Sequence, residues 1–237
     1  MDMTMPFRKI SLVVACAVMG AAAVVPTSAV AASPEVPIFA FDDCPAIPAG
    51  ADPTRWRCEE MHASGTIRLG TVTVPIALKT THAEGRLPDD PQTRFIFGAL
   101  RADPVRIPGR SAITVAPEYA GHIDFVAGPP MAEILHLRYR VRGRHVAGNC
   151  AIGTTTDPIV VVGEIVGERV PVQEEPLVLR FAVVDDDLAV PVSYGCGAFG
   201  GLVDRRFGLP SDGELALTVY FSVRTYDRTG AKRHERP

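Results

Sequence analysis

The segment Leu215-Ala216-Leu217-Thr218-Val219-Tyr220-Phe221-Ser222-Val223-Arg224 alternates large apolar side chains with smaller or more polar ones. Successive side chains of a β-strand point to opposite faces, so this alternation predicts a strand with one face on a core. The same alternation occurs in the segment 177–184. There the apolar face carries Leu177, Leu179, Phe181 and Val183. The chain is therefore expected to be built from strands.

Period-two spacing continues through the part of the chain that begins at Gly65. The apolar positions change phase between Leu69 and Val72, with Gly70 at the shift, which indicates a tight turn or a bulge. Clusters of Gly, Pro and Asp separate the other apolar runs, as turns do. These runs predict further strands at Arg94–Leu100, Ala112–Ala116, Ile134–Val141, Ile159–Val166 and Leu188–Val192.

About eight or nine strands with short turns, and no helical stripe longer than two turns, predict an all-β fold. We expect a single-domain antiparallel β-sandwich over residues 65–226. A β-barrel is the alternative, because both folds show the same alternation. Residues 33–64 are rich in Pro and Asp and are expected to be irregular, and the polar tail 227–237 is expected to fray.

Residues 1–32 have the three-part pattern of a secretory signal peptide. Two basic residues at 8–9 precede an apolar run over 10–25, and small residues follow, with cleavage expected near Ala31 or Ala32. The run is shorter than the roughly 20 residues that cross a bilayer core, so an uncleaved anchor ranks second. Lipid attachment at Cys16 ranks third. We therefore expect a secreted or cell-surface protein with no transmembrane helix in the mature chain.

The composition excludes some classes of protein. The chain is 47% hydrophobic, which is too high for a disordered protein. It has 24 Lys and Arg against 27 Asp and Glu, a formal net charge of −3. Removing residues 1–32, which contain two basic residues and one acidic residue, changes this to −4. A slightly acidic chain is a poor electrostatic partner for nucleic acid, so no nucleic acid is expected to bind.

Four cysteines remain after residue 32, namely Cys44, Cys58, Cys150 and Cys196. An even number of cysteines in an exported protein predicts disulfides rather than free thiols. Sequence proximity favours Cys44–Cys58, which leaves Cys150–Cys196, although three pairings are possible. The cysteine spacings match no zinc ribbon, so no metal is expected on these residues.

Five segments distributed along the chain carry a resemblance. They read DCP at 43–45, DPTRWRCE at 52–59, THAEGRLPD at 81–89, FGALR at 97–101 and DRRFGLP at 204–210. Together they resemble a group of uncharacterised secreted proteins of high-GC Gram-positive bacteria, of actinobacterial type. The resemblance covers nearly all of the chain after residue 32. It implies an extracellular location and a single domain, and it implies no activity, cofactor or catalytic residue.

The sequence contains no G-x-S-x-G elbow, so no catalytic residue is predicted and a non-catalytic protein is favoured. Two histidines have a carboxylate on the same face of an expected strand, His82 with Glu84 and His122 with Asp124. The acidic run Asp185–Asp187 is expected to form a solvated turn. No ligand spacing singles out an ion, so neither a metal nor another cofactor is predicted.

Three arginines, Arg138, Arg140 and Arg142, share one face of an expected strand. Same-face residues stand about 6.6–6.8 Å apart, so the three guanidinium groups repel one another and need compensation. Carboxylates of residues 185–187 or 174–175 would provide it in a surface network, which is the favoured interpretation. The alternative is an anionic ligand held by the guanidinium forks.

These observations predict a secreted, non-catalytic β-sandwich protein that binds an anionic component of the cell envelope or another extracellular ligand. Its partner is otherwise unknown. The alternative is an extracellular hydrolase with a dispersed site that uses His82, His122 or Asp185–Asp187. A pocket in which a histidine and a carboxylate converge would favour the enzyme, and a filled core would favour the binding or structural role.

Overall fold

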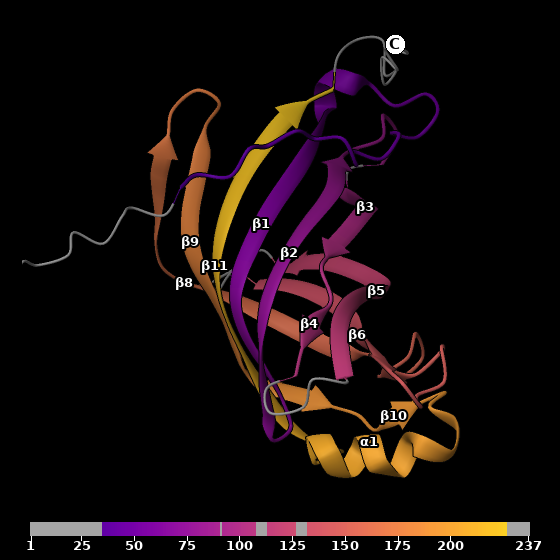
Figure 1. Ribbon diagram of the computed structural model, residues 1–237. Helices are drawn as coiled ribbons and strands as arrows, with labels where there is room; N and C mark the ends of the chain where they lie inside the picture. Colours follow the sequence, from indigo (N-terminus) through magenta and orange to yellow (C-terminus); the bar gives the residue numbers. More distant parts are fainter. Residues whose placement is uncertain (1–34, 91, 108–112, 127–131, 227–237) are drawn as a thin grey trace, which may run out of the picture. The chain divides into compact units, whose positions relative to one another are not determined.

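The computed structural model describes residues 35–90, 92–107, 113–126 and 132–226 (Figure 1). From Val36 onward the chain forms one compact unit. The expected signal peptide at 1–32, the polar tail at 227–237 and two turns, at 108–109 and 128–130, lie outside the described residues. In the part of the chain that is described, no helix has the length and apolar character to span a membrane.

The described residues are mostly in β-strands. The strands are β1 (Trp56–Leu69), β2 (Val72–Gly85), β3 (Arg94–Ala102), β4 (Val105–Arg106), β5 (Ile113–Val126), β6 (Ala132–Gly143), β7 (Ala151–Ile152), β8 (Ile159–Gln173), β9 (Val178–Val190), β10 (Ser193–Tyr194) and β11 (Ser211–Thr225). The helical elements are two 3-10 turns, η1 (Pro53–Arg55) and η2 (Gly197–Phe199), and one α-helix, α1 (Gly200–Phe207).

All the strand pairs are antiparallel, and they form one sheet that curls into a half-barrel (Figure 1). The main order is β5-β6-β8-β9-β11-β1-β2-β3. Strand β4 pairs with β5, β7 pairs with β6 at Tyr139 and Arg140, and β10 pairs with β7. The all-β, antiparallel class predicted from the alternation is confirmed.

Strands β3 and β5, at the two ends of the main strand order, approach each other through side chains. The rings of Phe97 and Tyr119 stack with centroids 3.5 Å apart, and those of Phe95 and Phe125 lie 5.0 Å apart. Between their described residues, β3 and β5 form no hydrogen-bonded ladder. Aromatic packing therefore takes the place of backbone pairing where the two ends of the curled sheet meet.

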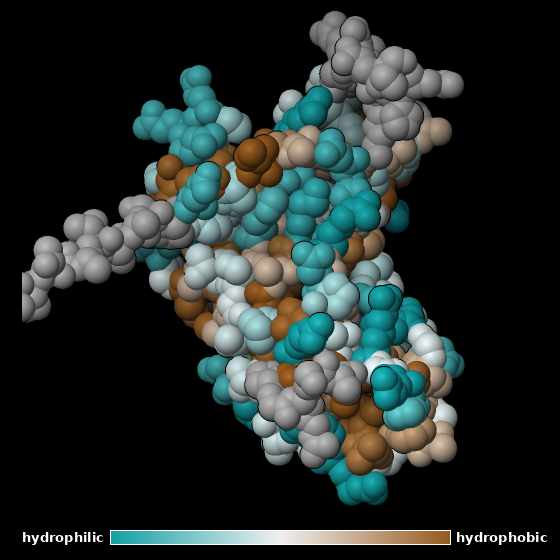
Figure 2. All heavy atoms as spheres, in the orientation of Figure 1, coloured by the Kyte–Doolittle hydropathy of each residue, from teal (hydrophilic) through white to brown (hydrophobic). Residues whose placement is uncertain are grey.

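The apolar faces predicted from the alternation are the faces that point into the half-barrel. In β11 the interior residues are Leu215, Leu217, Val219 and Phe221. In β6 they are Leu135, Leu137, Tyr139 and Val141, all of which are buried. On the face seen in Figure 2, hydrophilic residues are widespread and hydrophobic residues form smaller groups. Burial of these interior faces is the main favourable term in folding.

The irregular N-terminal segment ends at Arg55 rather than at residue 64, because β1 already begins at Trp56. Residues 57–62 read RCEEMH and show no simple alternation. Both faces of this part of β1 are covered by protein. On one face Cys58 bonds to Cys44 and the carboxylate of Glu60 accepts a hydrogen bond from the Phe41 N–H at 2.8 Å, and on the other face Glu59 and Met61 are buried. Polar residues with partners on both sides leave no hydropathy signal for the strand.

The run Asp185–Asp187 was expected to be a solvated turn, and that prediction is wrong. It lies inside β9, where the register against β11 shifts between Gly213 and Leu215. The side chain of Asp185 is buried and accepts hydrogen bonds from the backbone N–H groups of Val162 and Asp187. The carboxylate therefore satisfies donors that the bulge leaves without ladder partners.

Helix α1, which was not predicted from the sequence, packs at the end of the sheet where β1 turns into β2. Its residues Val203 and Phe207 are buried in the core, and Gly208 ends it in the left-handed conformation, with φ 72°. Gly70 forms a tight turn, with φ 62°, and the N–H of Thr71 donates to the Phe207 carbonyl at 2.7 Å. The helix thereby covers this end of the half-barrel.

Both expected disulfides are present, Cys44–Cys58 and Cys150–Cys196. The first attaches the N-terminal segment to β1. The second joins the residue that precedes β7 to the residue that precedes η2. Each bond connects an irregular segment, which has few ladder hydrogen bonds of its own, to its neighbours.

Candidate functional site

The interior of the half-barrel contains a cavity of about 620 Å³ at the end of the sheet away from the β1–β2 turn. It lies between the start of β1, the end of β2 and the facing parts of β3, β5, β6, β8 and β9. A volume of this size is typical of sites that take small molecules. A smaller cavity of about 290 Å³ lies beside it, and Arg57, Glu84 and Thr93 line both.

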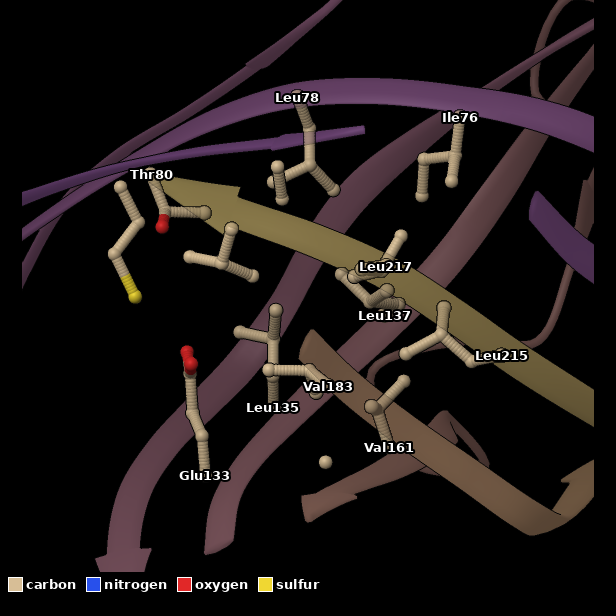
Figure 3. A pocket seen from close by; sticks show the side chains of 14 residues that line it. Ile76, Leu78, Thr80, Glu133, Leu135, Leu137, Val161, Val183, Leu215 and Leu217 are labelled. Carbon is tan, nitrogen blue, oxygen red and sulfur yellow. The ribbon is translucent and has the colours of Figure 1, made fainter. Parts of the chain in front are cut away.

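Aromatic and aliphatic side chains form most of the cavity wall. They include Phe95, Phe125, Ile165, Leu179, Phe181 and Phe221. A narrow inner space of about 50 Å³ is lined by some of the same residues, among them Met61, Glu133 and Val183, and by aliphatic side chains of β2, β6 and β11 (Figure 3). An apolar molecule would be well solvated by these walls.

Four polar side chains gather at one side of the cavity, where β1 pairs with β2. The antiparallel register places Glu59 directly opposite His82 and Arg57 directly opposite Glu84. The Arg57 guanidinium donates through Nε to Glu59 Oε1 and through Nη2 to Glu84 Oε2. One cation thus bridges two carboxylates that come from neighbouring strands.

A β-bulge in β3 adjoins this group. The register of β2 against β3 passes from Thr81–Ala99 to His82–Phe97, so Gly98 is the extra residue. A Cβ atom at Gly98 would lie 2.3 Å from the Asp43 carbonyl oxygen, which a larger residue would displace. The glycine lets the N-terminal segment pack closely here and sets Phe97 opposite His82.

His82 lies fully buried behind the cavity wall. Neither of its ring nitrogens has a hydrogen-bond partner among the described residues. Its Nε2 lies 3.3 Å from Glu59 Oε2, but the ring is not oriented for a hydrogen bond. The ring packs against Phe125, with centroids 5.0 Å apart, so its orientation is set by packing.

The environment moves the pKa values of the two facing carboxyls in opposite directions. Burial works against the ionisation of Glu59, but the His82 ring and the Arg57 guanidinium outweigh it and lower the pKa. For Glu84, burial and the neighbouring Glu59 carboxyl raise the pKa more than Arg57 lowers it. A proton taken up by this pair would therefore bind to Glu84 before Glu59.

Glu133 places a third carboxyl in the interior, pointing from β6 toward Thr80 among aliphatic side chains (Figure 3). Burial raises its pKa to about 7, the His82 ring opposes this, and the negative charge of Glu59 adds to it. The part of its surface that remains accessible faces the cavity, because Glu133 lines both the cavity and the inner space.

The three arginines of the predicted anion site lie on the outer face of β6. Arg138 and Arg140 both bind Glu118 of β5, with N–O distances of 2.9 and 3.0 Å. Arg142 is exposed, opposite Thr114, and has no ion-pair partner among the described residues. Burial opposes ionisation of Glu118, but hydrogen bonds and charge from Arg140 and Arg138 outweigh it and lower its pKa.

Neither carboxylate source expected from the sequence supplies this compensation, since Asp185 binds backbone groups and Glu118 is the partner of Arg138 and Arg140. Anion binding at Arg138, Arg140 and Arg142 stays a prediction. Any anion there would compete with Glu118 for two of the three guanidinium groups.

Of the residues considered for a dispersed hydrolase site, His82 is the one that lies beside the cavity. His122 is exposed, and its ring contacts His136 with centroids 4.7 Å apart. The Asp185–Asp187 run lies in the bulge of β9. His82 with Glu84 therefore forms part of a cluster as the strand periodicity suggested, while His122 and Asp185–Asp187 do not join it.

Arg57, Glu59, Glu133 and the phenylalanines of the cavity wall were not predicted from the sequence. The sequence showed that His82 and Glu84 share one face of a strand. It did not show that Glu59 and Arg57 of β1 lie opposite them, because that depends on the pairing register of β1 and β2. A glutamate on the same strand face as Leu135 and Leu137, within the segment Ala132–Leu137, was the available signal for Glu133.

Comparisons with protein families, with curated proteins and with solved structures found no match for this chain.

Proposed function

We propose that this protein is an exported, non-catalytic binding protein that takes one small amphipathic molecule into the half-barrel cavity. The observation that carries the proposal is the cavity of about 620 Å³, whose wall is mostly aromatic and aliphatic and includes a smaller number of charged and polar side chains. Ligand sites combine these two properties, because apolar area gives affinity and a few polar groups give orientation.

The charges that line the cavity favour a ligand with a basic head group. Four of these residues are acidic, Glu59, Glu84, Asp124 and Glu133, and two are basic, Arg57 and Arg169. An ammonium group could pair with a carboxylate, and the faces of the phenylalanine rings attract cations as well. The ligand proposed for the cavity is therefore an apolar molecule with an amine. Its charge is opposite to that of the anion predicted to bind Arg138, Arg140 and Arg142 on the outer face of β6.

Several features support an extracellular setting. Residues 1–32 have the pattern of a signal peptide, and the chain resembles secreted actinobacterial proteins. The two disulfides require an oxidising compartment to form and persist. A protein in that setting would meet amphipathic molecules of the envelope or of the surrounding medium.

A hydrolase is the second candidate, and one observation favours it. Glu59 and Glu84 both line the cavity, and their pKa values are moved in opposite directions. Acid–base pairs in enzymes show this pattern. His82, in contrast, is fully buried and does not line the cavity, so it would not contact a substrate directly.

The test is calorimetric titration of the purified, disulfide-bonded protein with a medium-chain primary alkylamine, and with the carboxylate and alcohol of equal chain length. We expect saturable binding of one molecule, tightest for the amine. Ile165→Trp should fill the cavity and weaken binding at least about tenfold, because the ligand loses apolar contact area. Val166→Trp is the matched control, since Val166 is the next residue of β8 and is exposed.

Equal binding by the two tryptophan variants, or no saturable binding of any of the three ligands, would contradict the proposal. Turnover of an ester, glycoside or phosphoester by the wild type, lost in Glu84→Gln, would show instead that the second candidate is correct.

A further inference from the structure

We propose that Glu59, His82 and Glu84 form a binding site for one divalent transition-metal ion, of which zinc is the type. The three side chains offer ligand atoms that all lie within 4.8 Å of one another. They come from two paired strands, so the backbone ladder of β1 and β2 holds them together. This site does not depend on the proposed function of the cavity.

The contact between His82 and Glu59 has the dimensions of a pair of metal ligands. Metal–ligand bonds of about 2.0–2.1 Å in a tetrahedral site place neighbouring ligand atoms about 3.4 Å apart. His82 Nε2 and Glu59 Oε2 lie 3.3 Å apart and are not aligned for a hydrogen bond. Among the described residues, neither ring nitrogen of the fully buried His82 has a hydrogen-bond partner, which costs desolvation free energy. An ion bound at Nε2 would provide a partner for one of the two nitrogens.

Arg57 orients the two carboxylates and leaves one oxygen of each for the ion. Its guanidinium binds Glu59 Oε1 and Glu84 Oε2, so Glu59 Oε2 and Glu84 Oε1 are available. Groups that hydrogen-bond to ligating carboxylates set their direction in known metal sites. Glu84 is less buried than Glu59, so it is the more accessible of the two carboxylates to an ion that enters from the cavity.

The ligand set selects the kind of ion. One imidazole with two carboxylates suits zinc and its neighbours in the first transition row. Calcium requires six or more oxygen ligands and magnesium an octahedron of oxygens, which these three side chains do not provide. The three protein ligands leave a fourth tetrahedral position. Because Glu59 and Glu84 line the cavity, that position faces the cavity, where water or a donor atom of a bound molecule could occupy it.

The experiment is titration of the chelator-treated, disulfide-bonded protein with Zn²⁺ by calorimetry, and with Co²⁺ by visible absorption. No cavity ligand is present, so the outcome is separate from that of the alkylamine titration. We expect one ion per chain and the intense visible bands of a four-coordinate cobalt centre. Glu84→Gln should weaken binding at least about tenfold, because the carboxylate ligand is replaced by a neutral amide.

Two further variants test whether the ion binds at this cluster. His122→Ala removes the exposed histidine that contacts His136, and it should leave the affinity unchanged. Glu59→Gln tests a second ligand, since substitution of the fully buried His82 could unfold the protein, and its folding is checked by far-UV circular dichroism. Absence of stoichiometric binding would show that the cluster is an ion-pair network without a metal. Binding that persists in folded Glu84→Gln and Glu59→Gln, or that is lost in His122→Ala, would also overturn the proposal.

Discussion

The carboxyl of Glu133 shows how one residue can dominate the behaviour of a site. It is held among aliphatic side chains, and both His82 and Glu59 lie near enough to influence its pKa. Burial disfavours its ionised form, so the proton is retained to a pH at which exposed glutamates have lost theirs. Near neutral pH this side chain can either donate a hydrogen bond or carry a charge, and the head group of a bound molecule would decide which.

The titration of Glu133 predicts a pH-dependent stability. The pKa of its carboxyl is about 7 in the folded protein, against an ordinary value of 4.5. Because the folded state holds the proton more tightly, its contribution is complete below pH 4.5 and is lost as the pH rises through about 7. The free energy of unfolding should therefore fall by an amount on the order of 2–3 kcal/mol across this range.

Urea unfolding of the metal-free protein at several pH values measures this change. Glu133→Gln should remove most of it and should raise the stability at pH 8. Glu164→Gln, at an exposed position of β8, controls for the loss of one negative charge. An unchanged pH dependence in Glu133→Gln would show that another group is responsible.

At the scale of elements, the turn between β1 and β2 depends on both the conformation and the small size of Gly70. Its φ is 62°, and a Cβ atom there would lie 2.1 Å from the Phe207 carbonyl oxygen. That carbonyl accepts the Thr71 N–H, so it cannot move away without loss of a hydrogen bond. The turn and the end of α1 are therefore packed as one unit.

Gly70→Ala should destabilise the protein more than Gly50→Ala does. Gly50 also has a positive φ, of 83°, but has open space around its Cβ position. The left-handed conformation costs about 1–2 kcal/mol in both variants. The clash at Gly70 should add about 1–3 kcal/mol, since the Phe207 backbone must shift. Thermal and urea unfolding of the two variants give the difference directly, and equal losses would mean that α1 adjusts freely.

At the scale of the whole fold, one end of the half-barrel is filled and the other is hollow. The filled end contains Leu69, Phe207 and the core residues around them, and α1 covers it. The hollow end is bounded by the polar start of β1 and by the aromatic contacts between β3 and β5. Stability can therefore be concentrated at one end while the other end keeps space for a molecule.

The disulfides should stabilise this arrangement unequally. The Cys44–Cys58 bond closes a loop of 14 residues and the Cys150–Cys196 bond a loop of 46. On the chain-entropy estimate, their removal costs about 3 and about 4 kcal/mol. The paired Ser variants should show these losses in urea unfolding. The Cys44→Ser/Cys58→Ser protein should also be cleaved faster by protease before β1, because its N-terminal segment is no longer attached to that strand.

No change in the unfolding free energy, with the N-terminal segment still resistant to protease, would mean that other contacts hold the segment. The contacts to examine would then include the hydrogen bonds from Thr81 to the Asp43 carbonyl, from Tyr226 to the Pro45 carbonyl and from the Phe41 N–H to Glu60, and the ion pairs of Asp43 with Lys79 and Arg101.

Local pattern was sufficient for the strand class and for the disulfides, but not for every strand boundary, since the predicted turn at Asp185–Asp187 and the separate strand at Leu188–Val192 are largely parts of β9. The alternation of Leu215 to Phe221 depends on the geometry of one strand, so it predicted which side chains face inward without knowledge of any neighbour. The pairing of Cys44 with Cys58 followed from proximity along the chain. Where a segment has partners on both faces, as residues 57–62 do, hydropathy carries no such signal and the start of β1 was misplaced.

The cavity and its polar cluster depend on the tertiary structure alone. Glu59 meets His82 across the β1–β2 hairpin, and Glu133 of β6 enters the same interior because the sheet curls until β3 approaches β5. A sequence determines the face on which each side chain of a strand lies, since that is a property of its own backbone. It does not show the register between strands that are distant in the sequence, or how strongly their sheet bends. Both are set by the packing of all the strands together.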